Sequence, residues 1–285
     1  LVYTFNMKKI NIARMKEAKL LIKNKTKMFS EFRGNTRMAI MTQMALSDDM
    51  EGCFDAVKSA YEKLNAKKLF SSEYRIVAAM VIAQNESDES QYDALVTKIN
   101  DLMDRMRKNH PWLTGDEDTG FAALLAVSGL QTDYVITEME KCYQFLKESK
   151  KFGNLNGVQS LSQILSLELH NSEEKCNRVI SIYEGLKERK KKYGQTYELS
   201  ILGGLALADA EISELVEQIA ETDDYLKTQK GFGAFGIGNA QRLMYASMLV
   251  MQQYTSKINN TIAAAALSGI VAIIIAQQAA LIAAI

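Results

Sequence analysis

The stretch FRGNTRMAIMTQMAL at residues 32–46 places an aromatic residue before a short polar turn and a run of apolar residues. The same order of residue types follows five other aromatic side chains. The six aromatic residues are Phe32, Phe70, Trp112, Phe152, Tyr193 and Phe232, and successive members are 38, 42, 40, 41 and 39 residues apart. A regular period of this length is typical of a helix pair that is used repeatedly along a chain. The sequence therefore predicts a helical-repeat protein.

Composition favours an all-α chain of this kind. Pro111 is the one proline in 285 residues, and helix-forming Ala, Leu, Lys and Glu are abundant. No segment alternates β-branched and polar residues with the period of two that a half-buried strand requires. We therefore expect no sheet.

Each repeat is expected to hold a longer amphipathic helix, an aromatic turn and a shorter apolar helix. In the long helix expected at residues 48–68, Phe54, Val57, Tyr61 and Leu64 form one apolar stripe. Other long helices are expected at residues 8–28 and around stripes that begin at Tyr92, Val135, Cys176 and Ile212. The shorter helices are expected at residues 36–46, 74–83, 119–128, 157–167, 197–208 and 239–251.

The shorter helices are apolar nearly all round, so they must be covered on most sides. This predicts six pairs of one outer and one inner helix, arranged as an α/α toroid or, alternatively, as an open α-solenoid. The body of the protein is expected to comprise residues 1–257. Residues 258–285 carry no charge and are expected to form a separate apolar C-terminal helix.

The turns that open the inner helices are expected to lie on one rim. Helix N-termini attract anions, and lysines at the ends of the outer helices add positive charge. The polar residues of this rim are candidates for binding a ligand or for capping the helices. The candidate binding residues are Arg33, Asn35, Arg37, Glu73, Arg75, Asp116, Asp118, Asn156, Glu198 and Arg242.

The sequence lacks the common motifs for nucleic-acid, metal and cofactor binding. The 34 basic and 34 acidic residues cancel, which argues against nonspecific nucleic-acid binding. Two histidines and three widely spaced cysteines form no metal-ligand motif. Gly231, Gly233 and Gly236 match the spacing of a dinucleotide-binding loop, but a lysine-rich helix precedes them instead of a strand. We therefore expect no metal and no cofactor, and we interpret the cysteines as buried thiols of a cytoplasmic protein.

The uncharged segment at residues 261–285 is long enough to cross a bilayer core. Its alanines and two internal glutamines favour a different interpretation, in which it is a buried helix of the body or of a homodimer. Membrane association through this segment is the alternative. A disordered or processed tail is the third interpretation.

Three segments carry a family resemblance: FRGNTRMAIMTQMAL at residues 32–46, WLTGDEDTGFAALLAVSGLQ at 112–131 and GNLNGVQSLSQILSL at 153–167. With the QQAA of the C-terminal region, they resemble the family called domain of unknown function 4003. The resemblance covers nearly the whole chain and implies a bacterial protein. It carries no functional residue onto any position here.

These patterns leave three functional hypotheses. The first is a non-catalytic scaffold that binds a peptide, a protein or an anionic ligand on its rim. The second is an enzyme of toroid type that uses Glu73, Asp118 or Glu198 on a small or sugar-like substrate. The third is a membrane-associated scaffold held by its C-terminal segment.

Overall fold

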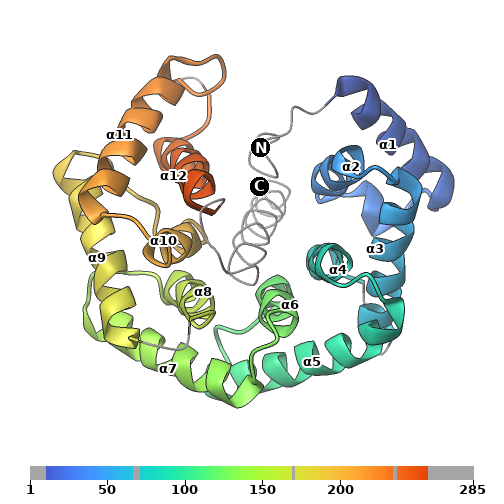
Figure 1. Cartoon of the computed structure of the whole chain (residues 1–285), viewed down its shortest axis with the longest axis horizontal. Helices are drawn as coiled ribbons and strands as arrows, with labels where there is room; N and C mark the ends of the chain where they lie inside the picture. Colours follow the sequence, from blue (N-terminus) through green and yellow to red (C-terminus); the bar gives the residue numbers. More distant parts are fainter. Residues whose placement is uncertain (1–10, 67–70, 169–170, 234–235, 256–285) are drawn as a thin grey trace. The chain divides into compact units, whose positions relative to one another are not determined.

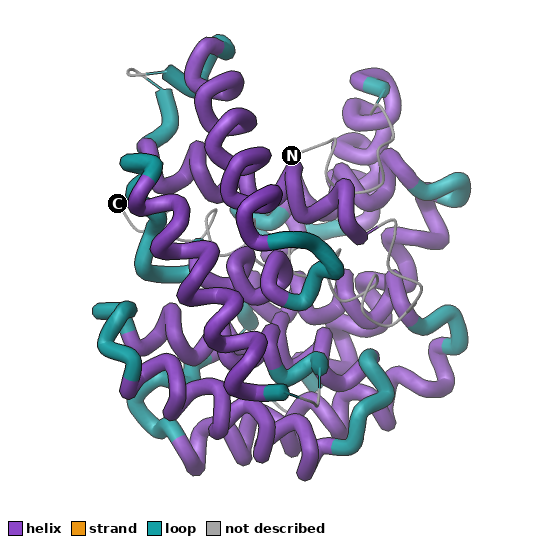
Figure 2. Tube along the Cα trace, turned by 60° about the vertical axis from the view of Figure 1, so that its left-hand side comes forward, coloured by secondary structure: helices purple, strands orange, loops and turns teal. Residues whose placement is uncertain are grey.

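The computed structural model describes residues 11–66, 71–168, 171–233 and 236–255. These residues form helices joined by turns, and no strand occurs among them (Figure 2). The predicted all-α class is therefore confirmed. The 40-residue period and the choice between toroid and solenoid stay predictions.

Odd-numbered and even-numbered helices alternate along the chain. The odd-numbered helices are α1 (Ile12–Lys25), α3 (Met50–Asn65), α5 (Tyr92–Asn109), α7 (Thr132–Glu148), α9 (Ser172–Glu188) and α11 (Ile212–Thr228). The even-numbered helices are α2 (Arg37–Leu46), α4 (Glu73–Asn85), α6 (Thr119–Val127), α8 (Leu155–Leu165), α10 (Leu199–Ala206) and α12 (Asn239–Thr255). Three 3₁₀ turns are η1 (Glu31–Arg33), η2 (Glu89–Gln91) and η3 (Asp116–Asp118). Each of the twelve helices expected before residue 258 is present, with ends a few residues from those predicted.

The helices divide into two compact units, with the boundary next to Thr132. In the first unit, α1, α3 and α5 form one layer, which packs on a second layer of α2, α4 and α6 (Figure 1). In the second unit, α9 and α11 pack on α10 and α12, and α8 packs on α10. Each unit is therefore a two-layer arrangement of helices around an apolar core.

The two layers differ in how much of each helix is buried. In α3 the buried residues include Phe54, Val57 and Leu64, which are three or four positions apart and form one face. In α4, by contrast, every residue from Arg75 to Ile82 is buried. In α6 every residue from Thr119 to Ala126 is buried. The even-numbered helices thus supply the interior of each unit, as their uniform apolarity predicts.

Cationic side chains of α1 and α5 donate hydrogen bonds to the C-terminal ends of α2 and α6. Arg14 Nε of α1 donates to Ala45 O of α2 at 2.8 Å. Lys98 Nζ of α5 donates to Ala126 O at 3.2 Å and to Leu130 O at 2.7 Å, where α6 ends. Carbonyl groups at a helix C-terminus lack partners within the helix and carry partial negative charge. These contacts therefore fix each long helix against the end of a short one.

The aromatic residues that mark the period are not equivalent in the structure. Phe32 is buried and makes edge-to-face contacts with Phe54 and Tyr61, with ring centroids 5.4 Å and 5.1 Å apart. Phe152 and Tyr193 are also buried, whereas 94% of Trp112 is exposed. After α5, the N–H groups of residues 113 and 114 both donate to the His110 carbonyl, and Thr114 is buried instead. Phe70 lies outside the described residues.

The glycine motif at Gly231, Gly233 and Gly236 lies in the connection between α11 and α12, as predicted. Gly231 has a φ of +89°, a conformation that favours glycine, and its carbonyl accepts from Ile237 N at 3.1 Å. No strand precedes the motif in the described part of the chain, so a dinucleotide-binding frame is not formed there.

None of the helices that the structure describes is both long enough and apolar enough to cross a membrane. The C-terminal segment at residues 258–285 lies outside the described residues. Its interpretations as a buried helix, a membrane anchor or a tail therefore stay predictions.

Candidate functional site

The predicted binding residues lie, as expected, where the even-numbered helices begin. Glu73, the first residue of α4, extends to the start of α2. Its Oε2 accepts from the backbone N–H groups of Asn35 at 2.8 Å and Thr36 at 3.2 Å. This carboxylate caps a neighbouring helix. It therefore has a structural role at this position.

A second contact of this kind links α4 to the turn before α6. Arg75 is buried, and its guanidinium donates to Asn65 Oδ1 at 2.5 Å and to Asp116 Oδ1 at 3.1 Å. Asp118 is also buried, and its Oδ2 accepts from Gly115 N at 2.9 Å. Arg75 and Asp116 thus join two successive turns within the first unit, whereas Asp118 closes its own turn.

In the second unit the predicted residues are divided between interior and surface. Glu198 is buried and accepts from the Thr196 N–H and hydroxyl groups at 3.0 Å and 2.5 Å. Arg242 is buried and donates to Asp223 Oδ1 at 2.8 Å. Asn156, by contrast, is exposed in the first turn of α8.

The three carboxylates of the enzyme hypothesis therefore accept hydrogen bonds from groups of the protein itself. Glu73 accepts from backbone N–H groups of α2, Asp118 from a backbone N–H next to its own helix, and Glu198 from Thr196. None of the three lines either of the two cavities considered next. The enzyme hypothesis gains no support from them and stays a prediction.

Arg33 and Arg37, in contrast, line a cleft in the first unit. The cleft has a volume of about 450 Å³ and lies between α1 and the start of α2. Its described lining residues are Lys16, Lys19, Leu20, Ile22, Lys23, Arg33 and Arg37. We call these seven residues the basic cleft. Five of them are cationic and none is acidic, so an anion entering the cleft meets charge of one sign.

The local sequence explains how α1 presents this surface. Asn11 caps the helix by accepting from Ala13 N at 2.8 Å. Ala18 and Ile22 are the buried positions of α1 and face the unit. Lys16, Lys19 and Lys23 are three or four residues apart, so they share another side of the helix and are exposed there.

The described residues do not neutralise the charges of the basic cleft. No carboxylate of the described residues forms an ion pair with Lys16, Lys19, Lys23 or Arg37. Arg33 is held by neutral groups: its guanidinium donates to Thr26 Oγ1 at 2.9 Å and to the backbone carbonyls of Lys23 and Thr26. The cleft also includes the first residue of α2, where the helix dipole adds positive potential.

The charge of this region contrasts with that of the whole chain. Residues 12–37 contain eight Lys and Arg residues and two Glu residues, so their net charge is 8 − 2 = +6, whereas the whole chain is formally neutral. Arg33 and Arg37 were predicted from the sequence, whereas Lys16, Lys19 and Lys23 were not. The available signal was this local excess of basic residues.

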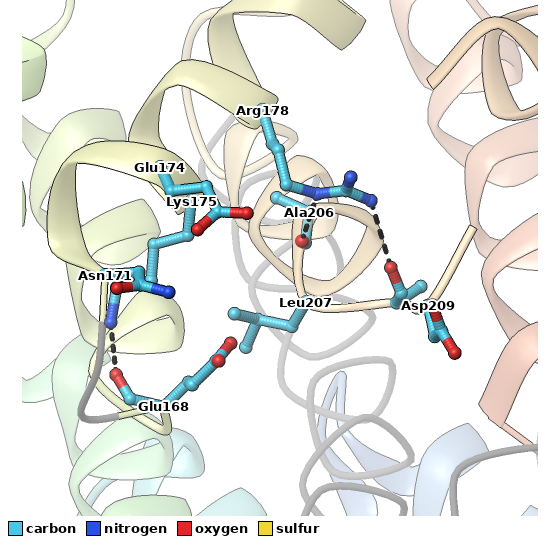
Figure 3. A pocket seen from close by; sticks show the side chains of 9 residues that line it. Glu168, Asn171, Glu174, Lys175, Arg178, Ala206, Leu207 and Asp209 are labelled. Atoms are coloured by element: carbon cyan, nitrogen blue, oxygen red, sulfur yellow. Dashed lines mark hydrogen bonds between the residues drawn. The ribbon is translucent and has the colours of Figure 1, made fainter. Parts of the chain in front are cut away.

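A second cavity, of about 250 Å³, lies between α9 and the end of α10 in the second unit (Figure 3). Its two cations are engaged by the protein. Lys175 is buried and pairs with Glu138, and Arg178 donates to the carbonyls of Ala206 at 3.0 Å and Ala208 at 3.0 Å. The other charged residues of the lining are Glu168, Glu174 and Asp209.

Among the described residues, no group of three or more His, Cys, Asp or Glu side chains is placed to hold a metal ion. The three carboxylates of this second cavity therefore do not form a metal site. The basic cleft is the stronger candidate for a ligand-binding site, because none of its cations forms an ion pair with a described carboxylate.

Comparison with known proteins assigns the family. The family model described as "Protein of unknown function (DUF4003)" matches residues 1–279. The chain belongs to this family. The resemblance noted in three segments of the sequence thus extends over nearly the whole chain. No curated protein and no solved structure matches the chain.

Proposed function

We propose that this protein is a non-catalytic helical scaffold that binds an acidic segment of a partner protein in the basic cleft. The observation that carries the proposal is the convergence of five cations, with no carboxylate, on a cleft that also contains Leu20 and Ile22. Leu20 is 59% exposed. An exposed leucine among lysines favours a ligand that brings both negative charge and apolar surface.

The chemistry of the cleft favours a peptide over a nucleic acid. A nucleic acid is bound through many phosphate contacts along an extended basic surface. Here the cations of the cleft lie on α1, η1 and the start of α2 only, and the whole chain is neutral. A cleft of about 450 Å³ suits a few side chains of an acidic segment.

The test uses a fluorescein-labelled decapeptide of Glu and Leu, with the same peptide carrying Gln for every Glu as the control ligand. We expect fluorescence anisotropy to show binding of the Glu peptide only, with an affinity that falls as salt is raised. In the variant Lys19→Glu/Arg37→Glu, we expect the affinity to fall at least about tenfold, because opposite charges become like charges.

The matched control variant is Lys108→Glu/Lys227→Glu, which reverses two exposed lysines outside the cleft. It changes the net charge by the same amount and should leave the affinity nearly unchanged. Equal binding of the Glu and Gln peptides, or equal losses in the two variants, would show that the cleft is not the binding site. Circular dichroism of each variant verifies that the helices are retained.

A further inference from the structure

Among the described helices of the first unit, α1 has an odd-numbered neighbour on one flank only. In the layer of odd-numbered helices, α3 contacts both α1 and α5, whereas α1 contacts only α3. Ile12, Lys16, Lys19, Leu20 and Lys23 are three or four residues apart and form one stripe on α1. Ile12 is 73% exposed and Leu20 is 59% exposed. We call these five residues the α1 stripe.

A stripe of opposite charge occurs on α11 of the second unit. Glu214, Gln218, Glu221 and Tyr225 are three or four residues apart, and we call them the α11 stripe. It contains two carboxylates and no basic residue, and Tyr225 is 64% exposed.

Ion pairs identify the side of α11 that faces α9. Two other carboxylates of α11, Glu217 and Asp224, pair with Arg189 and Lys191, which follow α9. These carboxylates mark the side of α11 that is turned to its neighbour. Glu221 is four residues from Glu217 and three from Asp224, so it borders that side of the helix. Glu214 and Gln218 accept from the Tyr254 hydroxyl of α12 at 2.9 Å and 3.1 Å. Glu214, Glu221 and Tyr225 nevertheless stay exposed to solvent.

We propose that the α11 stripe of one molecule docks on the α1 stripe of a second copy of this chain. This inference rests on the proposed function, because it names the acidic partner of the basic cleft. Charge complementarity supports it: three lysines meet two glutamates, and exposed Ile12 and Leu20 meet exposed Tyr225.

The symmetry of such a contact is head-to-tail. The two stripes are different surfaces, so each molecule keeps one free stripe after the first contact. The contact therefore leads to a closed ring or to an open chain of copies, and a symmetric dimer is not the product. The mean mass should rise with protein concentration and fall with salt, because salt screens the attraction between the oppositely charged stripes.

The experiment is sedimentation velocity of the full chain over a range of concentrations, with two charge-reversal variants. The first variant is Lys16→Glu/Lys23→Glu, and the second is Glu221→Lys/Tyr225→Lys. We expect the unmodified protein to associate and each variant alone to remain a monomer. An equimolar mixture of the variants should associate again, because the first keeps a native α11 stripe and the second a native α1 stripe.

Three results would overturn the inference: a monomer at every concentration of the unmodified protein, association that persists in both variants, or a mixture that stays monomeric although circular dichroism shows both variants folded. The peptide experiment separates this inference from the proposed function. If the Glu peptide binds while the protein stays monomeric, only the self-association is wrong. If the peptide also fails to bind, both are wrong.

Discussion

Lys175 of α9 and Glu138 of α7 form an ion pair in the interior of the second unit. Their Nζ–Oε1 distance is 2.7 Å, and the side chains are only 3% and 5% exposed. Ser172 Oγ donates to the same carboxylate oxygen at 2.6 Å, and the Glu168 carbonyl accepts from Lys175. Each charge is therefore compensated by several groups, as a buried charge requires.

Removing one partner of this pair should be strongly destabilising. We expect Lys175→Met to lower the free energy of unfolding by about 3–5 kcal/mol, because it leaves the Glu138 carboxylate buried without its cation. The double variant Lys175→Met/Glu138→Leu should recover much of this loss, since both charges are then removed. Urea unfolding measures all three proteins. Lys187→Met is the control, because Lys187 is 69% exposed and its pair with Glu184 contributes little.

The same pair predicts a dependence of stability on pH. Burial alone would raise the pKa of Glu138, but hydrogen bonds from Lys175 and Ser172 outweigh it and hold the pKa below the ordinary 4.5. A carboxyl whose pKa is lowered by folding stabilises the protein above its unfolded pKa. That stability is lost as pH falls through the folded pKa.

We therefore expect the unmodified protein to be more stable than Glu138→Gln near neutral pH, and the difference to shrink as pH falls below about 4.5. Urea unfolding of both proteins at a series of pH values measures this difference. A difference that does not change between neutral pH and the acid limit would contradict the assigned contacts.

The cap that Glu73 provides to α2 should be measurable. Glu73→Ala removes the acceptor for two backbone N–H groups at the start of α2. We expect a loss of about 1–2 kcal/mol in the free energy of unfolding. Glu17→Ala, at an exposed position of α1, should change the stability by less than about 0.5 kcal/mol. Similar losses in both variants would argue against the cap.

Trp112 is the one tryptophan of the chain, and 94% of it is exposed. We expect its fluorescence to be that of a hydrated indole and to be quenched by acrylamide about as well in the native protein as in urea. Urea unfolding followed by this fluorescence should show a small amplitude, while circular dichroism shows a full transition. Strong protection from acrylamide in the native protein would mean that another surface covers Trp112.

The thiols should be unreactive in the native protein. Burial raises the pKa of Cys53 to about 11, and Cys142 and Cys176 are fully buried. Because the thiolate is the reactive form, we expect slow labelling by a disulfide reagent at neutral pH and fast labelling of three thiols in denaturant. Fast labelling of one thiol in the native state, lost in Cys53→Ser, would show that Cys53 is accessible.

The helices could be predicted from sequence because their signals are local. The stripe of Phe54, Val57 and Leu64 and the uninterrupted apolar run of α6 each specify a helix within a few turns. The division at Thr132 has no such signal, because it depends on which helices pack together. Local sequence patterns therefore predict the helices but not how the helices are grouped into two units.

The candidate site was predictable in part. Arg33 and Arg37 follow an aromatic residue and precede an apolar run, so their place at a helix start was expected. The spacing of Lys16, Lys19 and Lys23 is also typical of the solvent-exposed face of a helix. They became cleft residues only because α2 begins beside the middle of α1. Glu73 was a candidate for binding or for capping, since residue type does not distinguish a carboxylate that binds a ligand from one that caps a helix.

Residues 98, 138 and 178 show a further limit, because they are spaced 40 apart. Lys98 and Arg178 hold the carbonyl ends of α6 and α10, whereas Glu138 pairs with Lys175. Glu138 has a different role from Lys98 and Arg178 because its partner, the buried Lys175, lies on the next odd-numbered helix. Spacing alone identifies equivalent positions but not their partners.

The carbonyl contacts of Arg14, Lys98 and Arg178 also determine where the chain tolerates changes in length. A helix advances about 1.5 Å and turns about 100° per residue. An insertion inside α1, α5 or α9 would therefore rotate the cation away from the helix end that it holds. An insertion in a connecting turn leaves that alignment intact. Length variation among members of this family should accordingly be concentrated in the turns, and designed fusions or labels should be placed there.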